Sequence, residues 1–136
     1  MLDKLRDRMA AYLAQHRVCV ISAAGPDGAR AMPARYRSAG LEVDCLLPRW
    51  ADVAYHLEQD GRVALVVQDT GAQGLRWLRC LGAARPVEQP DWDALLPAGA
   101  HIPAPAELYL VVRVTPRRID LLDESRGWGA RETLDL

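Results

Sequence analysis

The chain has 136 residues, a length that suits one domain with a substantial core and is short for two. Half of the residues are hydrophobic, 26% are charged and the formal net charge is -1, so the overall charge attracts neither nucleic acid nor an anionic membrane. No apolar run approaches the roughly 20 residues that span a bilayer, and the amino terminus mixes charges instead of showing a signal-peptide pattern. We therefore expect one cytoplasmic domain over residues 1–136, with neither a nucleic-acid nor a membrane partner.

The first half of the chain is predicted to form two helices and three strands, from its hydrophobic periodicity and turn signals. The expected elements are a helix over 2–16, strands over 17–22, 29–37 and 41–47, and a helix over 51–59. Pro33 cannot donate to a strand ladder, so we expect a sheet edge or an irregular point there. Asp52 falls in the first turn of the second helix, where a negative charge suits the helix dipole.

The second half is predicted to be mostly strand. The expected elements are strands over 62–68 and 75–87, a short helix over 90–96, a loop over 69–74, an ordered loop or surface lid over 97–105, a strand over 108–122 interrupted or kinked near Pro116, a turn over 124–129 and a terminal strand over 130–136. The run 62–68 lacks polar alternation, which indicates burial on both faces. Gly82 marks a bend or bulge. With one secure interior helix, these elements favour a mainly β (α+β) fold, an antiparallel barrel of six to seven strands with flanking helices.

Cys19, Cys45 and Cys80 each stand alone in an apolar, strand-like run. Their spacing fits neither a disulfide framework nor a zinc site, so we predict reduced thiols in the core.

Phenylalanine is absent, and four Trp and four Tyr residues supply the aromatic side chains. Buried Trp and Tyr need a partner for their polar group, which favours pockets and interfaces over a featureless core.

Several short stretches follow one another in a familiar order. They are the amino-terminal helix, Gly28-Ala-Arg-Ala-Met-Pro33, the junction 47–57, Gly82-Ala-Ala84 and Val114-Thr-Pro-Arg-Arg-Ile119. Together they resemble the pyridoxamine 5'-phosphate oxidase-like, FMN-binding split β-barrel family over nearly the whole chain. The resemblance implies a split barrel that binds FMN. It also implies a homodimer, in which the long strand and carboxyl-terminal segment of one subunit complete the flavin pocket of the other.

The phosphate-binding positions of that family are changed here. Family members place Thr or Ser at the end of the third strand and Ser-x-Lys at the start of the following helix, and these residues hold the FMN phosphate. Aligned on Leu57, the corresponding residues are Pro48, Ala51 and Val53. Arg49, in the same loop, is the candidate replacement, because a guanidinium binds phosphate in a bidentate way. The alternative is a solvated loop arginine.

The resemblance implies further contacts to the cofactor. Arg30 and Met32 fall on the second strand, where family members often place a basic group facing the flavin; the alternative for Arg30 is a surface arginine. Trp50 either stacks on the flavin or caps the barrel. Nearer the carboxyl terminus, Trp77, Trp128 and Arg131 either reach across a dimer into the partner's flavin pocket or cover the dimer interface. The predicted cofactor-binding residues are Arg30, Met32, Pro48, Arg49, Trp50, Trp77, Trp128 and Arg131.

Other chemistries have little support in the sequence. His16, His56 and His101 have no second ligand at metal spacing, so neither a metal site nor a haem site is predicted. No paired carboxylates, nucleophile elbow or glycine-rich phosphate loop occurs, and no catalytic side chain is assigned. The first hypothesis is a flavin-dependent oxidoreductase. The second is a non-catalytic module on the same scaffold that binds another small molecule or a partner protein.

Overall fold

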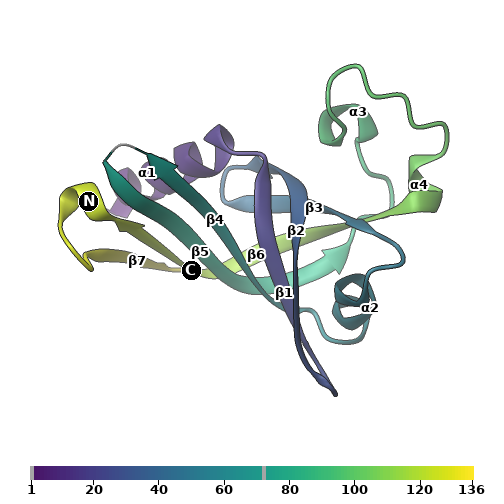
Figure 1. The fold of residues 1–136 in the computed structure, drawn as a ribbon, viewed down its shortest axis with the longest axis horizontal. Helices are drawn as coiled ribbons and strands as arrows, with labels where there is room; N and C mark the ends of the chain where they lie inside the picture. Colours follow the sequence, from purple (N-terminus) through teal and green to yellow (C-terminus); the bar gives the residue numbers. More distant parts are fainter. Residues whose placement is uncertain (1, 72) are drawn as a thin grey trace.

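The computed structural model describes residues 2–71 and 73–136 as a seven-stranded sheet with flanking helices (Figure 1). The elements are α1 Leu2–Gln15, β1 Val18–Gly25, β2 Gly28–Ala39, β3 Glu42–Pro48, α2 Asp52–Gln59, β4 Arg62–Gly71, β5 Gly74–Pro86, α3 Trp92–Leu95, α4 Pro105–Leu108, β6 Tyr109–Asp123, the 3-10 turn η1 Glu124–Arg126 and β7 Arg131–Asp135. No helix of the described residues is long and apolar enough to cross a membrane.

Six strands close into a barrel, and the seventh extends the sheet beyond it. The strands pair antiparallel in the order β3-β2-β1-β4-β5-β6-β7, and a further pairing between β3 and β6 joins the two ends. β6 makes the closure because it is 15 residues long. Its Tyr109–Val114 segment pairs with β3, and its Arg118–Leu122 segment pairs with β7. The predicted antiparallel split barrel is confirmed.

The two longer helices pack at opposite ends of the barrel. α1 leads into the start of β1, and the Tyr12 hydroxyl donates to the Val67 carbonyl, late in β4, at 2.9 Å. α2 packs at the other end of β1, where the His56 ring lies against Gly25; a Cβ on that glycine would come within 2.3 Å of the ring. Figure 1 shows α1 and α2 on different sides of the sheet, with the α3–α4 segment extending away from it.

Alternation along the strands fills the barrel with aliphatic side chains. Ile21, Leu65, Leu78 and Ile119 are completely buried and come from four different strands. Burial of each such side chain contributes about 1.5–3 kcal/mol relative to exposure. The barrel interior is therefore a packed core, and a ligand of this fold has to bind on the rim or the outer surface.

Three sequence-based expectations need correction. β6 runs through Pro116 without the expected interruption, but an irregularity does lie beside that residue: Leu81 pairs with Arg118 and Gly82 with Pro116, which leaves Arg117 as an extra residue in the pairing with β5. β4 extends to Gly71, which shortens the expected loop, and only one of its faces is fully buried, with Ala64 and Val66 half-exposed on the other. The turn of helix α4 falls where the end of the proline-rich loop and the start of a strand were expected.

Two other expectations are confirmed. β3 pairs only with residues 35–39 of β2, so Pro33 lies in a part of β2 with a free edge. Gly82 lies at the register shift, and a Cβ there would come within 2.2 Å of the Thr115 carbonyl oxygen. Pro33, which lacks an N–H donor, therefore lies at a free strand edge, and Gly82, which lacks a Cβ, lies where the backbones approach closely.

Candidate functional site

The junction between β3 and α2 presents backbone donors rather than side-chain ligands. β3 ends at Pro48, and the Ala51 N–H donates to the Pro48 carbonyl at 3.0 Å. Ala51 is the N-cap of α2, and no side chain of the described residues caps this helix end. Because the first N–H groups of a helix have no partner within it, this end of α2 offers donors and the positive end of the helix dipole.

The positions aligned with the family's phosphate ligands cannot act as ligands here. Ala51 is 3% exposed and Val53 is fully buried, so both side chains belong to the core. Pro48 is half-buried and pairs with Tyr109 of β6. None of the three carries a hydroxyl or an ammonium group, so any anion at this junction depends on the α2 backbone and on neighbouring side chains.

Arg30 and Asp52 meet at this junction. The Arg30 Nε lies 3.1 Å from the Asp52 Oδ2, with the two side chains 36% and 60% exposed. Arg30 Nη1 also donates to the carbonyls of Asp27 at 3.4 Å and Ala29 at 3.2 Å. The ion pair joins the β1–β2 hairpin to the first turn of α2, and at this exposure it contributes at most about 1 kcal/mol. Sequence reasoning placed Asp52 on the helix but missed this pairing, since no local pattern links a strand residue to a later helix.

The remaining predicted residues near the junction are spread around it. Arg49 Nε donates to the Ala106 carbonyl at 2.7 Å, so its side chain fastens the α4 turn to the end of β3. Trp50 is 84% exposed, and its ring is available to a group from outside this chain. Met32 is half-buried, packs against the core and pairs with Ile21 of β1. The structure brings Arg30 to the first turn of α2, and among the described residues no hydrogen bond or ion pair joins Arg30 to Arg49 or Trp50.

A second group of predicted residues lies on the outer face of the sheet. Trp77 of β5 pairs with Leu122 of β6, which in turn pairs with Arg131 of β7. Residues paired across antiparallel strands point to the same face, so Trp77 and Arg131 stand in one row, separated by Leu122. Trp128 precedes β7 and is 87% exposed.

The two groups lie toward opposite ends of the barrel. Arg30 pairs with Ala23 of β1, which pairs with Val63 early in β4, whereas Trp77 pairs with Gln68 later in the same strand. Five steps along a strand correspond to about 16 Å. Within one chain, the α2 junction and the Trp77–Arg131 row therefore do not line one pocket.

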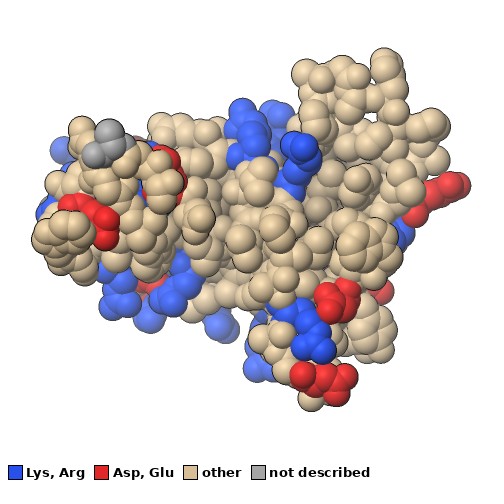
Figure 2. Space-filling view, in the orientation of Figure 1, with Lys and Arg blue, Asp and Glu red and all other residues tan. Residues whose placement is uncertain are grey.

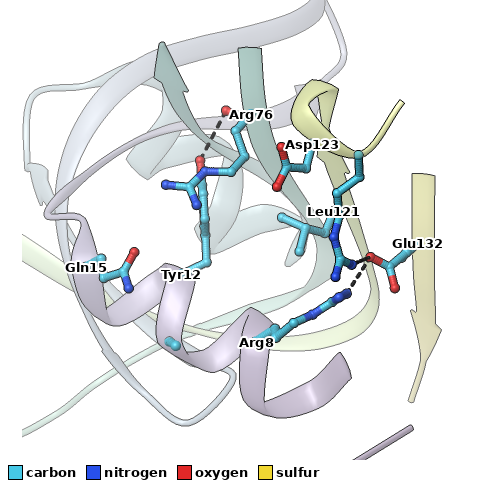
Figure 3. A pocket seen from close by; sticks show the side chains of 9 residues that line it. Arg8, Tyr12, Gln15, Arg76, Leu121, Asp123 and Glu132 are labelled. Atoms are coloured by element: carbon cyan, nitrogen blue, oxygen red, sulfur yellow. Dashed lines mark hydrogen bonds and ion pairs between the residues drawn. The ribbon is translucent and has the colours of Figure 1, made fainter. Parts of the chain in front are cut away.

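A cleft of about 250 Å³ opens next to β7, between α1 and the end of β6 (Figure 3). Tyr12 lines it, and burial raises the pKa of this phenol to about 12. The Arg76 guanidinium lies 5.0 Å from the centre of the Tyr12 ring and pairs with Asp69 at 2.8 Å. A hydrogen bond from Arg76 holds the pKa of the Asp69 carboxyl below its usual range.

Ion pairs also neutralise the other side of this cleft. Glu132 accepts hydrogen bonds from Arg8 and from Arg126, the latter at 2.9 Å. Asp123 faces the same cleft, and hydrogen bonds from Ser125 lower the pKa of its carboxyl. The charges of the cleft are thus largely matched internally, and its wall is held together by side chains from α1, η1 and β7.

Asp120 forms a buried ion pair that sequence reasoning did not single out. Its carboxylate is 1% exposed and accepts from Arg79 at 2.8 Å and from Thr133 at 2.6 Å. Burial by itself would raise the pKa of Asp120, but these two hydrogen bonds and the Arg79 charge outweigh it and lower the pKa. The pair ties β5, β6 and β7 together beside the Trp77–Arg131 row.

The cysteines and histidines are engaged within the fold. Cys19, Cys45 and Cys80 are free and buried, and the Cys19 and Cys45 sulfurs lie 3.9 Å apart. Burial raises the pKa of Cys80 to about 12. His16 Nδ1 hydrogen-bonds with the Tyr12 carbonyl at 2.8 Å. No group of His, Cys, Asp and Glu suited to a metal occurs within residues 2–71 and 73–136.

Comparison with known proteins gives no match by sequence and several by structure. No family model and no curated protein matches the chain. A protein related to general stress protein 26, of the pyridoxinephosphate oxidase family, from Clostridium acetobutylicum has a TM-score of 0.76 and 12% identity, covering 98% of this chain and 96% of that chain. This chain has the pyridoxamine 5'-phosphate oxidase-like split-barrel fold.

Two further neighbours with this split-barrel fold are named for a bound cofactor. An FAD-binding protein from Mesorhizobium loti has a TM-score of 0.64 and 15% identity, and the match covers 82% of this chain and 89% of that chain. A heme-binding protein from Mycobacterium smegmatis has a TM-score of 0.69 and 15% identity, covering 96% of this chain and 56% of that chain. At these identities the similarity establishes the fold, and the function has to be argued from the site.

Proposed function

We propose that this protein is a homodimeric flavin-binding protein that holds FMN between two copies and acts as a flavin-dependent oxidoreductase. One observation carries the proposal: the two groups of predicted residues lie toward opposite ends of one barrel. A second copy related by a twofold axis brings the Trp77–Arg131 row of one chain to the α2 junction of the other. The FAD-binding neighbour supports the choice of a flavin.

The outer sheet face supports a second copy. Val18 and Val20 of β1 are 52% and 41% exposed, although β-branched apolar side chains on a sheet are usually covered. In register with Val20 stand Pro33 of β2 and the half-buried Val66 of β4, which makes an apolar strip across three strands. Burial of such a strip favours association of two identical faces.

The phosphate end of FMN would be held in a modified way. The uncapped N–H groups of α2 donate to an anion, and Arg30 of β2, 3.1 Å from Asp52 in the first turn of α2, can turn its guanidinium toward a phosphate. These groups fit a phosphate, with Asp52 as an opposing charge. Arg49 stays a predicted contributor, provided that it leaves the Ala106 carbonyl.

The flavin, when bound, supplies hydride-transfer chemistry through its ring system, and the protein contributes position and electrostatics. In this proposal Trp77 of one copy covers the ring from the partner side. Arg131, on the same row, places a positive charge near the ring. Trp50 and Trp128, both highly exposed, close the rim of the shared pocket. No side chain of this chain has to transfer a proton for such chemistry.

An absorbance spectrum and a titration test the proposal. Purified protein should show flavin bands, or should bind added FMN with quenching of tryptophan fluorescence. Arg30→Ala should weaken FMN binding about tenfold or more, the effect of losing one charge-assisted hydrogen bond. A colourless protein whose fluorescence is unchanged up to high micromolar FMN rules out flavin binding.

Sedimentation analysis tests the dimer separately. Val20→Asp should convert the dimer to a monomer, because it places a charge in the apolar strip. Leu2→Asp is the matched control, since Leu2 is 67% exposed on α1 and lies away from that strip. A wild-type chain that sediments as a monomer, or an unchanged Val20→Asp dimer, contradicts the proposed interface.

The second candidate function is a non-catalytic small-ligand-binding or interaction module on the same scaffold. It is favoured by the loss of all three phosphate-binding side chains at the junction and by the carboxylate of Asp52 in their place. The same spectrum separates the candidates: a dimer that binds no flavin supports the module. A Soret band instead would indicate haem, the cofactor named for the Mycobacterium smegmatis neighbour.

A further inference from the structure

A basic groove lies between the end of α1 and the α3 segment, and the proposed flavin site does not use it. We call basic groove the cleft of about 220 Å³ that is lined by Arg17, Arg35, Tyr36, Arg37 and residues 94–98. Among these lining residues three are arginines and none is acidic. Figure 2 shows Lys and Arg atoms gathered where α1 leads into β1, beside the α3 segment, without Asp or Glu atoms next to them on this face.

The three guanidinium groups keep free donors and uncompensated charge. Arg17 Nη1 donates to the carbonyls of Ala14 at 2.7 Å and His16 at 3.0 Å, and Arg37 Nη1 donates to the Ala94 carbonyl at 3.3 Å. These acceptors are neutral. Within residues 2–71 and 73–136, none of the three arginines forms an ion pair with a carboxylate. A guanidinium has five N–H donors, so most of them remain available.

Three acidic residues, Glu42, Asp44 and Asp91, line the neighbouring cleft that shares Arg37 with the groove, and the Asp44 carboxylate is already bound by another arginine. Asp44 of β3 pairs with Arg37 in the sheet register, but its two oxygens accept from Arg113 at 2.8 and 3.0 Å. Arg35 and Arg37 project from the same face of β2, with a backbone separation of about 7 Å. Their charges repel each other, and an anion bound between them removes that repulsion.

The size and walls of the groove narrow the class of anion. A volume of about 220 Å³ holds a phosphate and a small organic group, and the lining residues Leu95, Leu96 and Pro97 give that group an apolar wall. Phosphate carries nearly two charges and several acceptor oxygens, which match converging arginines. A nucleic-acid strand needs a longer basic track than three arginines, and the net charge of the chain is -1.

We propose that the basic groove binds the phosphate group of a small phosphomonoester. Arg35 and Arg37 bind the phosphate oxygens, Arg17 adds charge from the end of α1, and residues 94–98 cover the organic part. Along β2 the groove residues Arg35 and Arg37 lie five and seven residues from Arg30, about 16 and 23 Å. It is therefore a second site that needs no flavin, although Arg35 borders the proposed dimer face because it pairs with Val18.

Amide chemical shifts measured by NMR at constant ionic strength test this site, with inorganic phosphate and phenyl phosphate as probes. We expect saturable shifts at residues 35–37 and 94–98, with phenyl phosphate binding more tightly than inorganic phosphate. Arg35→Ser and Arg37→Ser should each weaken binding about tenfold. Arg117→Ser is the matched control, because Arg117 is an exposed strand arginine outside the groove, and it should leave binding unchanged.

Arg17 calls for a conservative substitution, because its side chain also donates hydrogen bonds to the carbonyls at the end of α1 and its removal would disturb the helix. Arg17→Lys keeps the charge and is the variant to compare with Arg35→Ser. Equal weakening by Arg117→Ser would show a diffuse surface effect and overturn the proposal. So would shifts that never saturate, or a single-stranded oligonucleotide that competes more strongly than phenyl phosphate.

Discussion

Replacement of Asp52 by asparagine should tighten FMN binding and leave riboflavin binding unchanged. Asp52 sits in the first turn of α2 and pairs with Arg30 at 3.1 Å. A flavin phosphate at this helix end would meet a carboxylate of like charge and an arginine already engaged. Asp52→Asn removes the repulsion and releases Arg30, while riboflavin, which has no phosphate, is indifferent to both changes.

The expected magnitude follows from the exposure of the pair. Two unit charges about 5 Å apart interact by about 0.8 kcal/mol in bulk water and by about 3 kcal/mol at the effective dielectric constant of a protein surface. The side chains are 36% and 60% exposed, so the lower half of this range applies. Adding the release of Arg30, we expect a gain of about 1.4–2.7 kcal/mol, which corresponds to a ten- to hundredfold lower dissociation constant for FMN.

Titration of the protein with FMN and riboflavin, followed by fluorescence, measures both constants. Glu58→Gln is the matched control, because Glu58 is exposed on the same helix and the change removes the same charge away from the first turn. If both flavins tighten equally, or if Glu58→Gln has the effect of Asp52→Asn, the electrostatic account of this junction is refuted. Failure of either flavin to bind any variant would instead contradict the proposed function.

Three further predictions concern the barrel itself. Gly82→Ala should lower the free energy of unfolding in urea by about 1–3 kcal/mol, because its Cβ would meet the Thr115 carbonyl; Gly71→Ala, with nothing within 4 Å, should not. Cys80, whose pKa burial raises to about 12, should react with a thiol reagent at neutral pH only after unfolding, and a fast native reaction would contradict its burial. The lowered pKa of Asp120 means that its stabilising contribution is present above the ordinary carboxyl pKa and is lost as the pH falls through the lower folded value. Asp120→Asn should reduce the loss of unfolding free energy at acid pH. An unaltered pH profile would show that Asp120 does not contribute to that loss.

The sequence was sufficient to name many residues of the candidate site. It was not sufficient to predict which of them contact one another. The sequence shows directly that Pro48, Ala51 and Val53 replace the phosphate-binding residues of the family. The burial of Ala51 and Val53 agrees with their lack of polar groups. The Arg30–Asp52 pair was not predictable, because it depends on how the β1–β2 hairpin packs against α2. The alternation of Arg35 and Arg37 was a usable signal for the basic groove, since it places both on one face of a strand.

The sequence by itself determined the two long helices and the approximate places of the strands, because hydrophobic periodicity, glycine and proline act within a few residues of the chain. It did not determine which face of β4 fills the barrel, because the apolar run 62–68 lacks polar alternation. Only the tertiary structure decided that β6 continues through Pro116, that Arg113 rather than Arg37 binds the Asp44 carboxylate, and that Trp77 and Arg131 share a row far from Arg30. Those relations join residues distant in sequence, and strand register and helix packing set them rather than local preference.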